Sequence, residues 1–136
     1  MKVGVDTNVL FYALNKETPF HQEARENLAL LVEKGQAVIA QQNLVELAVT
    51  LTKRGITPQE ASGYAKYFIE IMPIVRPTVK TLALFLDCID NLPLRGVKLF
   101  DLYLALTFIS NGVDYLYTYN KKDFQDIEGL KFWPPS

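Results

Sequence analysis

Four acidic residues, far apart in the chain, stand where short apolar runs end. Asp6 follows the first strand-like run, and Glu46 lies one turn into the helix expected after the second. Asp101 opens a largely apolar helix, and Asp123 follows the fourth run in the segment TYNKKDF. Because the carboxyl ends of parallel strands meet at one edge of a sheet, we expect these carboxylates to lie together. Crowded carboxylates raise one another's pKa unless a cation neutralises them. Oxygen ligands without a partnering His or Cys favour Mg²⁺ or Mn²⁺, which can activate water against a phosphodiester.

Each acid also has a purely structural interpretation. Asp6 and Asp101 are good helix N-caps. Glu46 shares a polar stripe with Asn43 and other residues, which suits a solvated helix face, and Asp123 suits a turn. Asp101 is the hardest to explain structurally, because the helix that follows it looks buried and gives an acid little water. The start of a helix also favours the ionised carboxylate that a metal needs.

The acids must be positioned by alternating strands and helices. Apolar runs that are continuous rather than alternating predict a parallel sheet covered on both faces. We therefore expect an α/β fold: a three-layer α/β/α sandwich with a central, mostly parallel sheet of four to five strands. Strands are expected at residues 2–5, 37–40, 74–76, 113–119 and 131–133. Helices are expected at residues 9–14, 19–33, 43–53, 57–72, 78–91 and 101–110.

Composition indicates one domain spanning residues 1–136. The hydrophobic fraction of 49% and the charged fraction of 21% are those of an ordinary globular protein. A net charge of −1 means that any nucleic-acid binding must come from local basic groups. The single cysteine, Cys88, excludes an internal disulfide and suits a reducing compartment. With no signal-peptide pattern and no apolar run near the ~20 residues of a membrane span, we expect a cytoplasmic protein without membrane association.

Four segments, taken in order, resemble the PIN-domain nucleases, and among them the VapC-type toxin ribonucleases of prokaryotic toxin–antitoxin pairs. The resemblance runs from Asp6 to Leu130, nearly the whole chain. Any one segment is a weak signal, but all four in this order and at these separations are a strong one. The segments are VDTNVL, NLVEL, FDLYLALT and TYNKKDFQDIEGL.

The resemblance implies a PIN-like fold and metal-dependent hydrolysis of RNA, with one or two Mg²⁺ or Mn²⁺ ions. Asp6 and Asp101 would hold the principal ion. Glu46 would join them or position the attacking water. Asp123 would help to hold a second ion and is the fourth acid by resemblance. No histidine base is required, and His21, the only histidine, is expected to be structural or solvated.

Three polar residues near the acids are implied as supporting groups. Asn8, in the DTN turn, would orient Asp6 or a water, and Thr118 would contact a water or the substrate. Asn120 stands where some relatives carry an acid, so whether Asn120 or Asp123 completes the metal site stays open. The resemblance also implies a homodimer and a small antitoxin partner. Their contacts are expected on the helix at residues 57–72, whose apolar residues suit a protein core equally well.

Small basic groups near the same edge are the expected RNA contacts. Lysine and arginine side chains supply sequence-independent affinity for phosphates. Arg95 and Lys98 form one group, and Lys121 and Lys122 form another beside Asn120. The pair at residues 53–54 is better explained as solvating. Tyr119 ends a strand and suits either packing or stacking on a base.

Three other classes compete with the ribonuclease interpretation. A catalytically inactive PIN-like RNA-binding or scaffold module is disfavoured because the main acids are all present. A haloacid-dehalogenase-like phosphatase would need a second Asp where this chain has Asn8 and a Thr where it has Leu10. A receiver-type signalling domain would need paired acids near the first strand, which the chain lacks.

Overall fold

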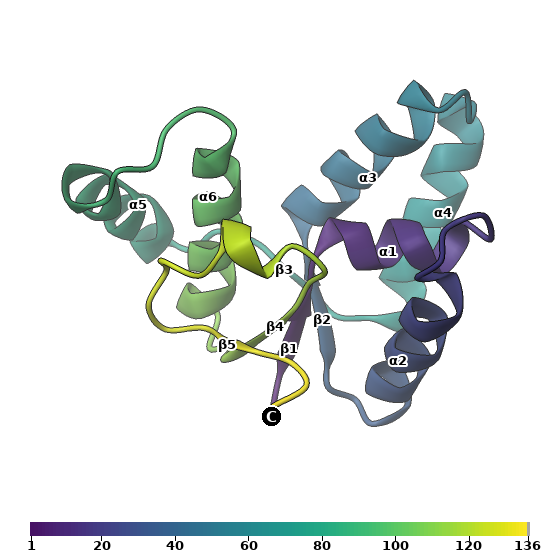
Figure 1. Ribbon diagram of the computed structural model, residues 1–136, viewed down its shortest axis with the longest axis horizontal. Helices are drawn as coiled ribbons and strands as arrows, with labels where there is room; N and C mark the ends of the chain where they lie inside the picture. The colour runs from purple at the N-terminus through teal and green to yellow at the C-terminus, as the bar shows by residue number, and fades with distance from the viewer. Residues whose placement is uncertain (136) are drawn as a thin grey trace.

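The computed structural model describes residues 1–135, which form a sheet flanked by helices (Figure 1). The strands are β1 (Val3–Val5), β2 (Ala37–Ala40), β3 (Ile74–Val75), β4 (Tyr115–Tyr117) and β5 (Lys131–Phe132). The helices are α1 (Thr7–Leu14), α2 (His21–Glu33), α3 (Gln41–Lys53), α4 (Pro58–Ile71), α5 (Val79–Asn91), α6 (Lys98–Ser110) and the short 3₁₀ helix η1 (Lys121–Asp123).

The five strands lie in the order β3-β2-β1-β4-β5, and every neighbouring pair is parallel. β1 is therefore central, with β2 on one side and β4 on the other. Val3 pairs with Ala37 of β2 and with Tyr115 of β4, so these three strands start level with one another. All strands point the same way, and the segments that leave their carboxyl ends gather along one edge of the sheet.

The helices form two layers because successive residues of each buried strand face opposite sides. In β2, Ala37 and Ile39 pack with residues of α1, α2, α3 and α4, whereas Val38 and Ala40 pack with residues of α6. Figure 1 shows α5 and α6 on one side of the sheet and α1 to α4 on the other. This is the expected three-layer α/β/α sandwich, with five parallel strands. None of the helices in residues 1–135 is long and apolar enough to cross a membrane.

Several expected boundaries were wrong in ways that matter for the acids. α6 begins at Lys98, so Asp101 lies within its first turn and does not cap it. α1 begins at Thr7, directly after Asp6, with no intervening loop. β4 is shorter than expected and ends at Tyr117, which leaves Thr118 and Tyr119 in the segment that leaves the sheet edge. Expected ends elsewhere differ by one or two residues.

Gly4 permits the closest approach between the sheet and α6. A Cβ atom at this position would lie 2.9 Å from ring carbons of Phe108, which is fully buried. Backbone and ring therefore cannot both keep their places if a methyl group is added. We expect Gly4→Ala to lower the free energy of unfolding by about 1–3 kcal/mol, measured by urea denaturation. The matched control is Gly63→Ala, in the exposed interior of α4.

A Cβ atom at Gly63 meets no atom within 4 Å, so its substitution should instead raise stability by about 0.5–1 kcal/mol. Equal effects of the two substitutions would contradict the tight contact at Gly4.

Candidate active site

Asp6 occupies the junction between β1 and α1, and both oxygens of its carboxylate are already held. Oδ1 accepts a hydrogen bond of 2.8 Å from the Thr7 backbone N–H, which makes Asp6 the N-cap of α1. Oδ2 accepts one of 2.8 Å from the Thr118 hydroxyl, at the end of the neighbouring strand β4. The side chain is only 8% exposed. Asp6 is thus both a cap and a carboxylate fixed in orientation at the sheet edge.

Glu46 reaches the same place from α3, the helix that follows β2. The Thr7 hydroxyl donates to Glu46 Oε1 at 2.9 Å, and the Asn43 amide donates to that hydroxyl at 3.1 Å. Asn43 is fully buried, and its Oδ1 accepts from the Ala40 backbone N–H at 2.8 Å. The expected solvated stripe is therefore wrong for Asn43, which closes the start of α3 and orients Thr7. An Asn placed three residues after a buried strand was the available signal.

All four acids line one open hollow of about 320 Å³. Asp6 and Glu46 enter it from the start of α1 and from α3. Asp101 enters it, half-buried, from the first turn of α6, and Asp123 enters it from η1. The sheet edge therefore brings together carboxylates that are separated by up to 117 positions in sequence (123 minus 6). The convergence expected from parallel strand ends is present in the structure.

The electrostatics of the hollow show that its negative charges are not balanced. The pKa of Asp101 is raised to about 7, first by burial and then by Asp6, Asp123 and Glu46, while Lys98 opposes the shift. The pKa of Asp6 is raised to about 6, chiefly by burial, although its hydrogen bonds from Thr118 and Thr7 lower it. Near neutral pH the hollow therefore favours either a proton or a cation.

The donor set suits a hard divalent cation, because it consists of carboxylate oxygens and carries no thiol or imidazole. Within residues 1–135, no three carboxylate, His or Cys side chains stand so arranged that they hold one ion together. Asp6 and Glu46 instead use oxygens for protein hydrogen bonds, and each of those oxygens keeps a second lone pair. Several of the acids would thus have to rotate their side chains to coordinate one ion together. Asp6, which two hydrogen bonds hold in place, would keep its orientation.

The expected supporting residues form a chain of contacts around Thr118. This hydroxyl donates to Asp6, while the backbone N–H of Asn120 donates to it at 3.0 Å and the Asn8 amide at 3.4 Å. Asn8 therefore reaches Asp6 through Thr118 and not directly. Thr118 is only 4% exposed, so its observed contact is with Asp6 and not with solvent. Asn120 is exposed and lines the hollow beside Asp123.

The basic residues are distributed differently from the expectation. Lys98 lies close enough to Asp101 to lower its pKa, and Lys121 and Lys122 line a second hollow nearby. Arg95 is exposed but lines neither hollow, so the structure gives it no place at the site.

Arg54 lines the acidic hollow, and its guanidinium carbon lies 4.8 Å from the centre of the Phe11 ring. Arg54 is exposed at the end of α3, as expected for a solvating residue, but its place at the acidic hollow was not expected. Its position next to a lysine at a helix end carried no sequence signal for the site.

Comparison with known proteins agrees with this architecture. The family model described as PIN domain matches residues 3–130. Ribonuclease VapC24 of Mycobacterium tuberculosis is 27% identical, over 98% of this chain and 96% of that protein. The fold is similar to that in the crystal structure of VapBC2 from Rickettsia felis bound to a promoter DNA fragment, with a TM-score of 0.76, 24% identity and 97% of each chain covered. It is also similar to VapC20 of M. tuberculosis, described as a sarcin-ricin loop cleaving toxin, with a TM-score of 0.72, 14% identity and coverage of 91% of this chain and 94% of that one. The chain belongs to the PIN domain family.

Proposed function

We propose that the protein is a divalent-metal-dependent endoribonuclease and the toxin of a toxin–antitoxin pair. The observation that carries the proposal is the meeting of four carboxylates in one hollow, where burial and mutual repulsion raise the pKa of Asp6 and Asp101. Membership of the PIN domain family and the similarity to Ribonuclease VapC24 support it. PIN-domain ribonucleases generally depend on a divalent metal, and for this chain we propose one or two Mg²⁺ or Mn²⁺ ions.

Each acid has a proposed role. Asp6 and Asp101 hold the principal ion, Glu46 joins them or orients the attacking water, and Asp123 helps to hold a second ion. Such an ion, when bound, polarises the phosphodiester and lowers the pKa of water. Thr118 keeps the Asp6 carboxylate in one orientation through its 2.8 Å hydrogen bond. Asn8 and Asn120 support Thr118 in turn.

The proposed substrate approaches an edge with cations on both sides of the acids. Arg54 borders the hollow from α3, while Lys98 lies beside Asp101 on α6. Lys121 and Lys122 lie along the neighbouring segment. These side chains would contact the phosphates of RNA and steer the backbone towards the carboxylates. We also propose that the protein acts in the cytoplasm, where RNA is present and where a free cysteine such as Cys88 stays reduced.

The direct test is RNA cleavage by the purified protein. We expect a mixture of structured RNAs to be cut internally in the presence of Mg²⁺ or Mn²⁺ and to stay intact in EDTA, as read on a denaturing gel. Cleavage should return when excess metal is added back, because the carboxylates of the hollow remain available as ligands. The attacking nucleophile is water activated by the metal, so nothing else has to be restored. Cleavage that persists in EDTA would contradict the metal dependence. Metal binding without cleavage of any RNA would favour the inactive scaffold.

The phosphatase alternative loses its basis with the family assignment, since residues 3–130 match the PIN domain. The phosphatase and the nuclease can also be distinguished by their substrates. A phosphatase would hydrolyse small phosphate monoesters, whereas the proposed nuclease should leave them intact.

We also propose a homodimer and an antitoxin partner. Similar folds occur in DNA-bound VapBC from Salmonella typhimurium and in a toxin–antitoxin complex from Klebsiella pneumoniae. On α4, where these contacts were expected, Phe68 is buried and so is Met72 just beyond the helix, and both belong to the core. Ile69, Tyr67 and Tyr64 are exposed to 48%, 53% and 38%, and they are the large apolar side chains of this helix that a partner can cover.

A further inference from the structure

A second and larger hollow, of about 620 Å³, adjoins the acidic one. Asn120 and Asp123 line both hollows, so the two form a continuous surface around the end of β4. The volume lies within the range of pockets that bind small organic ligands. A molecule that places one group at the carboxylates can therefore place its neighbouring group here.

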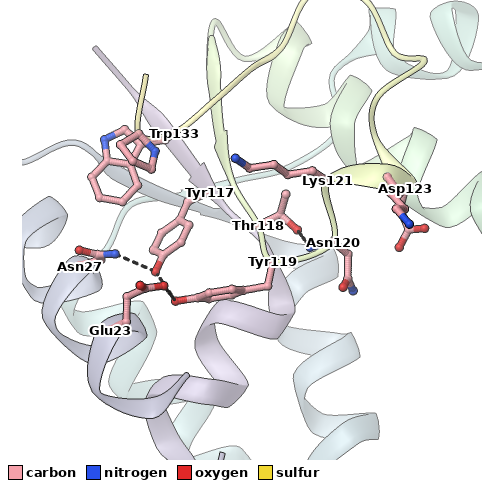
Figure 2. A pocket seen from close by; sticks show the side chains of 11 residues that line it. Glu23, Asn27, Tyr117, Thr118, Tyr119, Asn120, Lys121, Asp123 and Trp133 are labelled. Atoms are coloured by element: carbon pink, nitrogen blue, oxygen red, sulfur yellow. Dashed lines mark hydrogen bonds between the residues drawn. The ribbon is translucent and has the colours of Figure 1, made fainter. Parts of the chain in front are cut away.

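One wall of this pocket is formed by aromatic rings that pack against one another. The ring centres of Tyr117 and Trp133 lie 4.9 Å apart, and those of Tyr117 and Tyr119 lie 5.6 Å apart. Behind them, Tyr119 packs against Phe20 and Tyr12 at 4.8 and 5.3 Å. Figure 2 shows Trp133, Tyr117 and Tyr119 along one side of the pocket. Aromatic faces held in this way offer a stacking surface for a planar ring.

Polar atoms at the same side are arranged so that they accept hydrogen bonds from a ligand. The Tyr119 hydroxyl donates to Glu23 Oε1 at 2.7 Å, and the Asn27 amide N–H donates to the Tyr117 hydroxyl at 3.1 Å (Figure 2). Burial, followed by the hydrogen bonds with Tyr117 and Glu23, raises the pKa of Tyr119, so this hydroxyl stays protonated. The Tyr119 hydroxyl and one N–H of the Asn27 amide are thereby engaged as donors, while the carboxylate oxygens of Glu23 and the amide oxygen of Asn27 keep acceptor capacity.

Charge differs between the two ends of the pocket. Glu23, on α2, makes the aromatic end negative, whereas Lys121 and Lys122 line the end next to Asn120 and the acids. A ligand that fits both ends has a planar ring with N–H donors on its outer edge and a negative group beside the lysines. A nucleotide has this layout.

We propose that the pocket holds one nucleobase of the RNA substrate, stacked against Trp133 and read through its amino edge by Glu23. The inference rests on the proposed ribonuclease function. The base placed in the pocket is the one next to the phosphate that lies at the carboxylates. Guanine fits best, because its N1–H and N2–H can donate to both oxygens of one carboxylate. Uracil, with a single N–H donor and two carbonyl oxygens, fits worst.

The chain provides its own probe, because Trp133 is the only tryptophan. We would titrate the full-length protein with GMP, UMP and ribose 5-phosphate in EDTA, exciting the indole at a wavelength where nucleotides do not absorb. The indole N–H proton resonance, followed in the same titration, detects a bound base even without quenching. GMP should give saturable changes and bind about tenfold more tightly than UMP, while ribose 5-phosphate should give none.

Glu23→Gln tests the proposed hydrogen bonds between Glu23 and the base without disturbing the aromatic side of the pocket. The amide oxygen can still accept from Tyr119, but the pair of equivalent acceptors is lost, so the preference for GMP over UMP should fall to about twofold or less. Glu26→Gln, one turn along the exposed face of α2, is the matched control and should keep the full preference. Glu26 does not line the pocket; its carboxylate accepts from Gln22.

The proposal is overturned if no nucleotide changes either signal, if GMP and UMP bind equally, or if Glu23→Gln leaves the preference intact. Pocket binding is measured without metal and without turnover, so it is independent of the nuclease assay. A protein that binds GMP as described but cuts no RNA would refute the ribonuclease function alone. A protein that cuts RNA but shows no base binding would refute the pocket alone.

Discussion

Asp101→Asn should abolish RNA cleavage and at the same time stabilise the metal-free protein. The amide has nearly the size of the carboxylate, but it lacks the charge that an ion requires and that Asp6, Asp123 and Glu46 repel. We expect the cleavage rate in saturating Mn²⁺ to fall by more than about 100-fold, because a group in direct contact with the proposed ion is lost. In EDTA, we expect the melting temperature to rise by about 2–5 °C, since a half-buried, repelled charge has been removed.

The opposite signs of these two changes are what distinguish a functional carboxylate from a structural one. Asn caps a helix about as well as Asp, so a residue that only caps would show little change in either measurement on this substitution. α6 also begins three residues before Asp101. Asp114→Asn is the matched control, because Asp114 is exposed and lies outside the acidic hollow. It should change neither the cleavage rate nor the melting temperature. Wild-type cleavage by Asp101→Asn would refute the proposed metal site.

The metal-free protein should become less stable as the pH rises from about 4 to 7. The pKa of Asp6 is about 6 in the folded protein against the ordinary aspartate value of 3.8, so the folded state binds more protons than the unfolded state in this window. Stability therefore falls with rising pH and levels off once Asp6 is ionised in both states. Asp6 alone should lower the free energy of unfolding by about 3 kcal/mol across the window. Asp101, whose pKa is about 7, extends the fall to neutral pH.

Urea denaturation in EDTA at several pH values measures this dependence. Saturating Mg²⁺ or Mn²⁺ should offset most of this fall, because the ion binds the ionised carboxylates of the folded state and adds about 2.7 kcal/mol at one hundred times its dissociation constant. Asp6→Asn is the informative variant, because it removes the well-buried carboxylate that contributes most to the slope of unfolding free energy against pH. A slope that is unchanged in Asp6→Asn, or stability that rises between pH 4 and 7, would contradict the raised pKa of Asp6 in the folded protein.

The fold and the acidic site show what local sequence patterns can predict. Short continuous apolar runs predicted a parallel, doubly covered sheet, and the structure has one with five strands. The positions of Asp6 and Asp123 after such runs predicted their meeting at one edge. Both conclusions depend on strand direction alone, which a buried apolar pattern specifies. The order of the strands was not readable, because it is decided by which helices pack on which face.

Side-chain partners were beyond the reach of the sequence. Arg54 was assigned to solvent, yet it borders the acids, because α3 runs beside the hollow and the Phe11 ring supports the guanidinium. Asn43 was assigned to a solvated stripe, yet it is buried and bonds both Ala40 and Thr7. Such roles depend on the rotation of a helix about its axis and on neighbours from other elements, neither of which one helix encodes.

An α/β sheet with acids at the carboxyl ends of its strands could be predicted from the order of residues alone, because residue type and hydrophobic period act locally. Which atoms are in contact depends on how the chain packs: Thr118 donates to Asp6 across 112 positions, and Tyr119 donates to Glu23 across 96. A hydrogen bond or an aromatic contact requires two groups within a few ångströms of each other. For residues far apart in sequence, that proximity is created by the packing of whole helices and strands.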